Sequence, residues 1–246
     1  MFIIIPKPNK TLYDTLKAFQ PIVLLNILGK LIEKVISSRL QFHSIVFNFN
    51  YPNQLEGIKQ CSTIDTSIFL TYLIYTEWVK GLHTSTLVFD IVQFFPFLNH
   101  YLLPIILTKV GFDSNISLFF YNYLINRQIQ YIWNNYISPC FNADIGVRQS
   151  SALSPILSVL YITPIFHILG KETKNLSIPI PIFFLSFVDN SLLISQKNFF
   201  DKSNANLFCS YNNIFSLFKQ LRLVIEHDKS EVFHFSRLRK NFNPPP

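Results

Sequence analysis

Gly146-Val147-Arg148-Gln149-Ser150-Ser151-Ala152-Leu153-Ser154-Pro155-Ile156-Leu157 is the stretch of this chain that says most about its fold. A short polar segment passes here into an apolar run. The Ser154-Pro155 step lies near the start of that run, where proline costs little because the first helical turn needs no backbone donor. The stretch therefore predicts a loop followed by a helix from about Ser151 to Leu169.

Two other segments place a carboxylate beside apolar residues. Leu87-Val88-Phe89-Asp90-Ile91 predicts a buried strand that ends near Asp90. Ser186-Phe187-Val188-Asp189-Asn190 lies between two expected strands, 182–187 and 191–195, so Asp189 is expected on a hairpin turn. A carboxylate at a strand end is a plausible metal ligand, although an aspartate taken alone is more often a turn or cap residue.

The rest of the chain alternates helical and strand patterns. Asn26 is expected to cap a helix with Lys30, Glu33, Lys34 and Arg39 on its solvent side. Its apolar stripe comprises Ile27, Leu28, Leu31, Ile32, Val35, Ile36 and Leu40. Ser62 and Asp65 form a capping-box signal for a second helix that runs to about Lys80. Further helices are expected at 101–109, 116–126 and 201–221, and strands at 128–133, 136–139, 223–226 and 232–235. This mixed order predicts an α+β fold.

Composition narrows the class of protein. The 246 residues carry a net charge of +7, which favours polyanionic partners such as nucleic acid. Three separated cysteines, Cys61, Cys140 and Cys209, indicate neither a zinc site nor a disulfide framework. Residues 150–170 lack charged side chains and pass a length test for a membrane span, so a membrane protein stays a lesser alternative. Pro155, Pro164 and the scattered basic residues count against it, and no membrane partner is expected.

The three segments together resemble the reverse transcriptase domain of LINE-type (non-LTR) retrotransposons, in particular fungal copies. The family string is Gly-Val-x-Gln-Gly-Ser-x-Leu-Ser-Pro-Ile-Leu, which residues 146–157 follow with few changes. Ile5-Pro6-Lys7-Pro8-Asn9-Lys10 also resembles the start of these enzymes. The resemblance covers nearly the whole chain. It implies a right-hand polymerase with an antiparallel palm sheet and packed helices, with fingers over 1–80 and palm over 81–246. The thumb and primer grip are expected downstream, so the chain is expected to be a fragment of a larger polyprotein.

The resemblance also implies roles for individual residues. Asp90 and Asp189 would be the metal ligands for two Mg²⁺ ions, with the Ile91 carbonyl helping, and Asn190 would stand beside them in the catalytic motif. Lys229 would be a proton donor near the triphosphate, and Phe95 would exclude ribonucleotides by blocking a 2′-hydroxyl. Gln20, Gln149 and Ser150 would line the nucleotide site. RNA template, DNA primer and deoxynucleoside triphosphates would be the partners, and the oligomeric state is not indicated. Phosphate contacts are expected from Lys7, Lys10, Lys30, Lys34, Arg39, Lys59 and Arg127.

Several positions depart from the family pattern. Gln20 stands where the family has arginine, and Asn190 stands where it has aspartate. Arg148 and Ser150 stand where fungal copies usually carry glycine, and Arg222 replaces a family glycine. Glu56 and Cys61 likewise replace glycine and arginine. Each change can arise from a single C-to-T or G-to-A substitution, which indicates a silenced repeat eroded by cytosine deamination. Chance, or a mistaken family consensus, is the plainer alternative.

Three functions therefore stay open. The first is a reverse transcriptase domain, mutationally inactivated, whose activity is doubtful because of Gln20, Ser150, Asn190 and the missing thumb. The second is a catalytically dead remnant that binds nucleic acid, and the third is the membrane protein. An intracellular location is expected, nuclear if the chain is a retrotransposon product.

Overall fold

The computed structural model describes residues 2–9, 12–15, 18–23, 25–49, 51, 54, 62–134, 136–148, 151–175, 183–187 and 190–237. Expectations for Lys10, Glu56, Lys59, Cys61, Gln149, Ser150 and Asp189 therefore lie outside the described residues. Cys140 and Cys209 are exposed free thiols.

A four-stranded antiparallel sheet carries the segments that the motifs single out. Its strands are ordered β10 (Ile225–Phe235), β3 (His83–Ile91), β9 (Asn190–Lys197) and β8 (Phe183–Phe187). Strand β3 lies inside the sheet and pairs with β9 from His83–Lys197 to Asp90–Asn190. Strands β8 and β9 form the expected hairpin. The sheet thus brings Asp90 beside Asn190.

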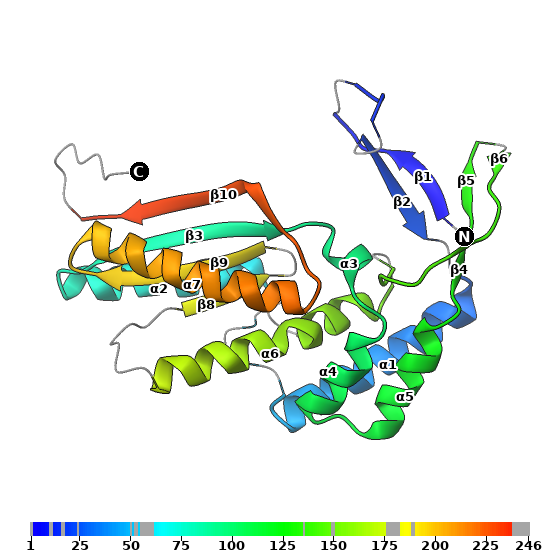
Figure 1. Cartoon of the computed structure of the whole chain (residues 1–246), viewed down its shortest axis with the longest axis horizontal. Helices are drawn as coiled ribbons and strands as arrows, with labels where there is room; N and C mark the ends of the chain where they lie inside the picture. The colour runs from blue at the N-terminus through cyan, green and yellow to red at the C-terminus, as the bar shows by residue number, and fades with distance from the viewer. Residues whose placement is uncertain are drawn as a thin grey trace.

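Helices cover both faces of this sheet. Successive strand residues point to opposite faces. Leu193 packs in the main core with Phe218 of α7 (Phe200–Gln220), whereas the next residue, Ile194, packs against Leu73 of α2 (Thr63–Val79). Figure 1 shows α7 in front of the strands and α2 behind them. The capping box of Ser62 and Asp65 at the start of α2 is present as predicted.

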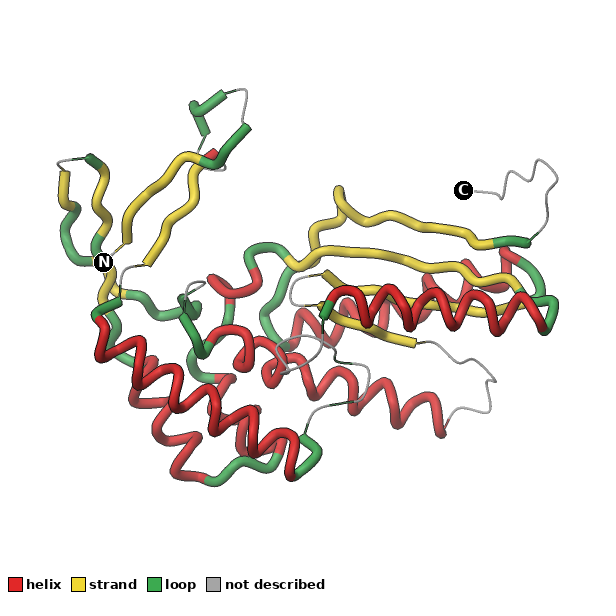
Figure 2. The backbone as a smooth tube through the Cα atoms, turned by 180° about the vertical axis from the view of Figure 1, so that it is seen from behind, coloured by secondary structure: helices red, strands yellow, loops and turns green. Residues whose placement is uncertain are grey.

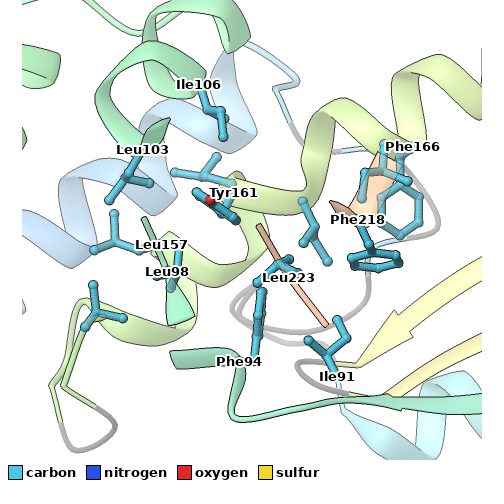
Figure 3. Packing of buried hydrophobic residues seen from close by; sticks show 14 of the residues in the cluster. Ile91, Phe94, Leu98, Leu103, Ile106, Leu157, Tyr161, Phe166, Phe218 and Leu223 are labelled. Atoms are coloured by element: carbon cyan, nitrogen blue, oxygen red, sulfur yellow. The ribbon is translucent and has the colours of Figure 1, made fainter. Parts of the chain in front are cut away.

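A helical region continues the main core beyond the sheet. It comprises α1 (Ile27–Val46), α3 (Phe94–Phe97), α4 (Leu102–Val110), α5 (Ser114–Leu124) and α6 (Ser154–Asn175). Figure 3 shows Leu157 and Tyr161 of α6 among Leu98, Leu103 and Leu223. The Tyr161 hydroxyl donates to the Leu221 carbonyl at 2.7 Å, and burial raises the pKa of Tyr161 to about 12. Helix α6 is therefore the common support of the helical region and the sheet.

Helix α1 buries a different face from the one predicted, although Lys30, Lys34 and Arg39 are exposed and Leu40 is buried as expected. Its buried residues are Glu33, Ser37, Leu40 and Ser44, while most of the apolar stripe is exposed, including Ile27, Leu28, Leu31, Ile32 and Val35. The prediction assumed that the more apolar stripe faces the core. A polar group can face the core where hydrogen bonds satisfy it, and Glu33 has such partners.

Short strands form two smaller sheets. β1 (Phe2–Pro6) pairs with β2 (Phe19–Val23) and with β5 (Tyr131–Trp133), which pairs with β6 (Tyr136–Ile137). β4 (Gln128–Ile129) pairs with β7 (Phe141–Asn142). Figure 2 shows the β1–β2 and β5–β6 hairpins projecting at the end of the molecule away from the large sheet.

The other predicted elements match or differ by small margins. Helix α4 ends at Gly111, as expected, in a left-handed conformation with φ +119°. The two strands expected at 223–226 and 232–235 are one strand, β10, with a register shift between Glu226 and Glu231. In the described part of the chain, none of the helices has the length and apolar character needed to cross a membrane.

Candidate active site

Asp90 lies at the last but one position of β3, between two other polar residues. It faces Asn190 in β9 and Glu226 in β10. Directly opposed residues of antiparallel strands share a face of the sheet. Asp90, Asn190 and Glu226 therefore gather on one face at one end of the sheet. Sequence reasoning did not single out Glu226, because its pairing with Asp90 joins distant parts of the chain.

Lys229 reaches Asp90 from the irregular part of β10. Its Nζ donates to Oδ2 of Asp90 at 2.6 Å, with side-chain exposures of 63% for the lysine and 19% for the aspartate. The register shift between Glu226 and Glu231 sets Lys229 in a bulge, and bulges commonly redirect a side chain. The structure thus places Asn190 and Lys229 next to Asp90, and their catalytic roles stay predictions.

The second oxygen of Asp90 is suited to a metal ion. Oδ1 is buried and has no hydrogen-bond partner among the described residues. A buried carboxylate oxygen left without a partner is costly unless a cation or water satisfies it, and Mg²⁺ prefers such oxygens. Within the described ranges no cluster of three or more His, Cys, Asp or Glu could hold a metal. Asp189 lies outside the described residues. The prediction that Asp90 and Asp189 together bind metal therefore stays a prediction.

The loop that begins at Gly146 is held against the residues that follow Asp90. Gly146 N donates to the Leu98 carbonyl at 2.7 Å, and Val147 N donates to the Phe95 carbonyl at 2.8 Å. Gly146 has φ +86°, and a Cβ there would lie 2.5 Å from the Pro96 carbonyl oxygen. Glycine is therefore required both by conformation and by close approach. These bonds fix the loop before α6 relative to the Asp90 strand.

His100 adds a side-chain bond to the same contact. Its Nε2 lies 2.6 Å from the Gly146 carbonyl oxygen. Burial lowers the pKa of His100, against the opposing effect of this hydrogen bond. A carbonyl oxygen can only accept, so the neutral ring carries its proton on Nε2.

Phe95 and Ile91 flank the site in different ways. Phe95 lies in α3, is half-buried and packs against the main core, so part of its ring stays accessible. Ile91 is 1% exposed and belongs to that core. The predicted roles of the Phe95 ring and the Ile91 carbonyl are compatible with these positions and stay predictions.

The predicted phosphate-binding cations do not form one group. Lys30, Lys34 and Arg39 are exposed on α1, and Lys7 is half-buried after β1. Arg127 is half-buried with its guanidinium 5.8 Å from the centre of the Tyr123 ring, and burial followed by repulsion from Arg148 lowers its pKa. Gln20 lies in β2 opposite Ile5. No pattern in the sequence predicted that Arg127 would lie over the Tyr123 ring.

Comparison with known proteins agrees with this arrangement. A sequence model of the family "Reverse transcriptase (RNA-dependent DNA polymerase)" matches residues 5–242. No curated protein sequence matches the chain. Apo telomerase from Candida tropicalis, truncated from its C-terminal domain, is similar in structure with a TM-score of 0.62 at 12% identity, covering 91% of this chain and 49% of that one.

A second telomerase structure shows the same likeness. Telomerase from Candida albicans, in complex with the TWJ fragment of telomeric RNA, has a TM-score of 0.54 at 13% identity, covering 84% of this chain and 35% of that one. This chain thus spans less than half the length of these telomerases. Identities this low establish a shared fold, here the fingers and palm of a polymerase. With the family match over residues 5–242, the chain belongs to the reverse transcriptase family.

Proposed function

We propose that this chain is the reverse transcriptase domain of a LINE-type (non-LTR) retrotransposon of fungal type, and that substitutions have inactivated it. The observation that carries the proposal is Asp90, which has one buried oxygen without a partner and the other 2.6 Å from Lys229. A carboxylate that keeps an oxygen available beside a lysine at a sheet end suits phosphoryl transfer, which needs metal ligands and a positioned proton donor. The division into fingers over 1–80 and palm over 81–246 belongs to the same proposal.

The chain's residues have distinct parts in such a site. Asp90 and Asp189 would hold two Mg²⁺ ions, which would activate the primer 3′-hydroxyl and offset charge on the transferred phosphoryl group. Lys229, whose Nζ lies 2.6 Å from Oδ2 of Asp90, would donate a proton to the leaving phosphate. Phe95 would press against the sugar of the incoming nucleotide. RNA template, DNA primer and deoxynucleoside triphosphate are the proposed partners, and a nuclear location follows from the same assignment.

Two observations support the loss of activity. Asn190 stands directly opposite Asp90, where an amide keeps an oxygen but lacks the charge of a carboxylate. Arg222 has φ +58°, a conformation that favours glycine, which is the residue expected there from the family pattern. An arginine at a glycine position is the kind of change that erosion by deamination produces.

Restoring the lost residues tests the proposal. The triple change Gln20→Arg, Ser150→Gly and Asn190→Asp, in a chain joined to a thumb and primer grip, should give Mg²⁺-dependent primer extension on an RNA template. The unrepaired chain should give little or none. Adding Asp90→Asn to the repaired protein should abolish extension. Extension that survives Asp90→Asn would mean that the metal site lies elsewhere.

A second function is supported by the exposed cations of α1, Lys30, Lys34 and Arg39. A remnant that binds nucleic acid without polymerising would use them for phosphate contacts. Its affinity for an RNA–DNA hybrid should then fall steeply as salt rises, because bound counterions are released. Salt-insensitive binding, or none at low salt, would remove this alternative.

A further inference from the structure

Glu226 is a second carboxylate beside Asp90, on the strand that comes first in the order of the large sheet. It pairs with Asp90 in the register of β10 and β3. Two residues further along β3, the Val92 amide donates to the Val224 carbonyl at 2.8 Å, which keeps the same register. The strand pairing next to Glu226 therefore fixes its position opposite Asp90.

The neighbours of the two carboxylates show which face of the sheet they occupy. Ile91 and Ile225 pair with each other and belong to the main core, where they are 1% and 2% exposed. Because successive strand residues point to opposite faces, Asp90 and Glu226 both point away from that core. They are half-buried, and Asn190, on the same face, is exposed. The three side chains thus lie on a face that solvent reaches.

The charges on this face call for a further cation. Like charges that face each other directly on antiparallel strands destabilise a sheet. Lys229 offsets part of the repulsion between Asp90 and Glu226 through its 2.6 Å contact with Oδ2 of Asp90. The other oxygen of Asp90, Oδ1, is buried and has no hydrogen-bond partner in the part of the chain that the structure describes. Two carboxylates and one ammonium leave a net negative charge beside an unsatisfied oxygen.

These oxygen donors suit a hard divalent cation. Mg²⁺ keeps several waters and is commonly bound through one or two carboxylates together with phosphate oxygens of a substrate. Asp90 and Glu226 provide two carboxylates from neighbouring strands. Asn190, on the other neighbour of the Asp90 strand, provides an amide oxygen without a charge. Glu226 therefore brings from β10 the negative charge that Asn190 does not bring from β9.

We propose that Glu226 is a ligand of the divalent cation that binds at Asp90, and that its charge replaces the one missing at Asn190. The inference rests on the proposed function, which places a metal ion at Asp90. It does not require that the chain polymerises, because an inactivated domain can still bind a metal ion.

Binding of Mn²⁺ alone, measured by electron paramagnetic resonance, tests this assignment. Glu226→Gln keeps the shape of the side chain and removes its charge, so the affinity for Mn²⁺ should fall by about tenfold. Glu231→Gln is the matched control, because Glu231 is exposed on the same strand beyond the bulge, opposite Val88. It removes the same charge farther from Asp90 and should leave the affinity unchanged. If Glu226→Gln does not fold, Glu226→Ser serves for the same measurement.

A double-mutant comparison tests whether Glu226 replaces the missing charge. Asn190→Asp gives β9 a carboxylate, so Glu226→Gln made in that background should weaken Mn²⁺ binding by less than about threefold. A loss of about tenfold in both backgrounds would mean that the two positions act independently, which would overturn the replacement of charge.

Thermal unfolding gives a readout that a purely structural role would not produce. In EDTA, the Tm of Glu226→Gln should equal or exceed that of the unchanged protein, because repulsion from Asp90 is relieved. Addition of Mn²⁺ should raise the Tm less in Glu226→Gln than in the unchanged protein, since a weaker ligand stabilises the fold less. A lower Tm in EDTA together with an unchanged Mn²⁺ affinity would assign Glu226 to packing and overturn the proposal.

The Mn²⁺ measurements also distinguish failure of this proposal from failure of the proposed function. If the unchanged protein binds no Mn²⁺, or if Asp90→Asn binds it equally well, the metal site at Asp90 fails and the role of Glu226 fails with it. If Asp90→Asn removes binding while Glu226→Gln leaves it unchanged, the role of Glu226 fails alone. The same holds if Glu231→Gln weakens binding as much as Glu226→Gln does.

Discussion

The ammonium of Lys229 lies 2.6 Å from Oδ2 of Asp90, although 139 residues separate the two in the chain. A pair of similar geometry lies at the end of α2, where Lys80 Nζ of the C-cap residue is 2.6 Å from Glu77 Oε1. Both lysines are 63% exposed at the side chain. The Asp90 pair differs in that the carboxylate keeps a buried oxygen without a partner among the described residues.

Replacing Lys229 should strengthen metal binding at Asp90. Lys229→Met removes a positive charge from the carboxylate, so Mn²⁺ affinity measured by electron paramagnetic resonance should rise by about two- to fivefold, in keeping with the modest energy of an exposed pair. Asp90→Asn should remove the site. Lys80→Met is the control and should leave the affinity unchanged. Weaker binding in Lys229→Met would instead make the lysine a support of the metal site.

Phe95→Ala should let ribonucleotides into the repaired polymerase described above. The ring is half-buried in α3, and its removal would relieve the proposed clash with a 2′-hydroxyl. Selectivity for deoxynucleotides, measured as a ratio of kcat/KM values, should fall by at least about tenfold, equivalent to about 1.4 kcal/mol. Phe97→Ala, in the same helix and also packed on the core, is the control. Equal losses in both variants would assign Phe95 to packing alone.

Arg222→Gly should stabilise the protein. Helix α7 ends with Arg222 N bonded to the Lys219 carbonyl and Leu223 N bonded to the Phe218 carbonyl, a Schellman motif that places Arg222 at φ +58°. The same motif after α2 uses Gly81, at φ +74°. Relief of the left-handed conformation should add about 1 kcal/mol to the free energy of unfolding. That gain should raise the Tm by about 2–4 °C. Arg222→Ala is the control, because it removes the guanidinium but keeps a Cβ in the left-handed conformation. A similar gain in stability from Arg222→Ala would mean that the charge of Arg222, and not its backbone conformation, destabilises the protein.

His100 should make the fold less stable in acid. Burial, the largest effect, and the charge of Arg127 lower the pKa of His100 below 6.5, while the Gly146 hydrogen bond and Asp144 oppose the shift. The unfolded chain then binds more protons than the folded one below about pH 6.5, so this contribution to stability is present above that pH and lost as pH falls. The free energy of unfolding, measured with urea at about pH 7.5 and about pH 5, should fall less between these pH values in His100→Gln than in the unchanged protein. An equal loss of stability in both proteins would mean that His100 does not contribute to the acid sensitivity of the fold.

The outward face of α1 should tolerate charge. Leu31 is 57% exposed and Leu40 is 2% exposed. Leu31→Lys should change the free energy of unfolding by less than about 0.5 kcal/mol, whereas Leu40→Ala should cost about 2–5 kcal/mol. Thermal unfolding followed by circular dichroism distinguishes the two. A large loss from Leu31→Lys would mean that the apolar stripe of α1 faces the core, as its sequence alone suggests.

Local signals in the sequence determined where most elements begin and end. Ser62 and Asp65 bond to each other's backbone or side chain within one turn, and Gly111 adopts its left-handed conformation without help from distant residues. Residues 146–157 likewise contain the signals for a loop and for the start of a helix next to each other in the sequence. Such signals are complete within a few residues, so they could be interpreted before any fold was known.

Only the tertiary structure decided which faces and which partners these elements have. Glu33 turns inward because Tyr123 and Ser151, from distant parts of the chain, satisfy its oxygens, and no periodicity in α1 contains that information. Lys229 reaches Asp90 because β10 pairs with β3 across a bulge. Hydrogen bonds and ion pairs between distant segments depend on where packing brings the segments, whereas caps and turns depend on the residues next to them.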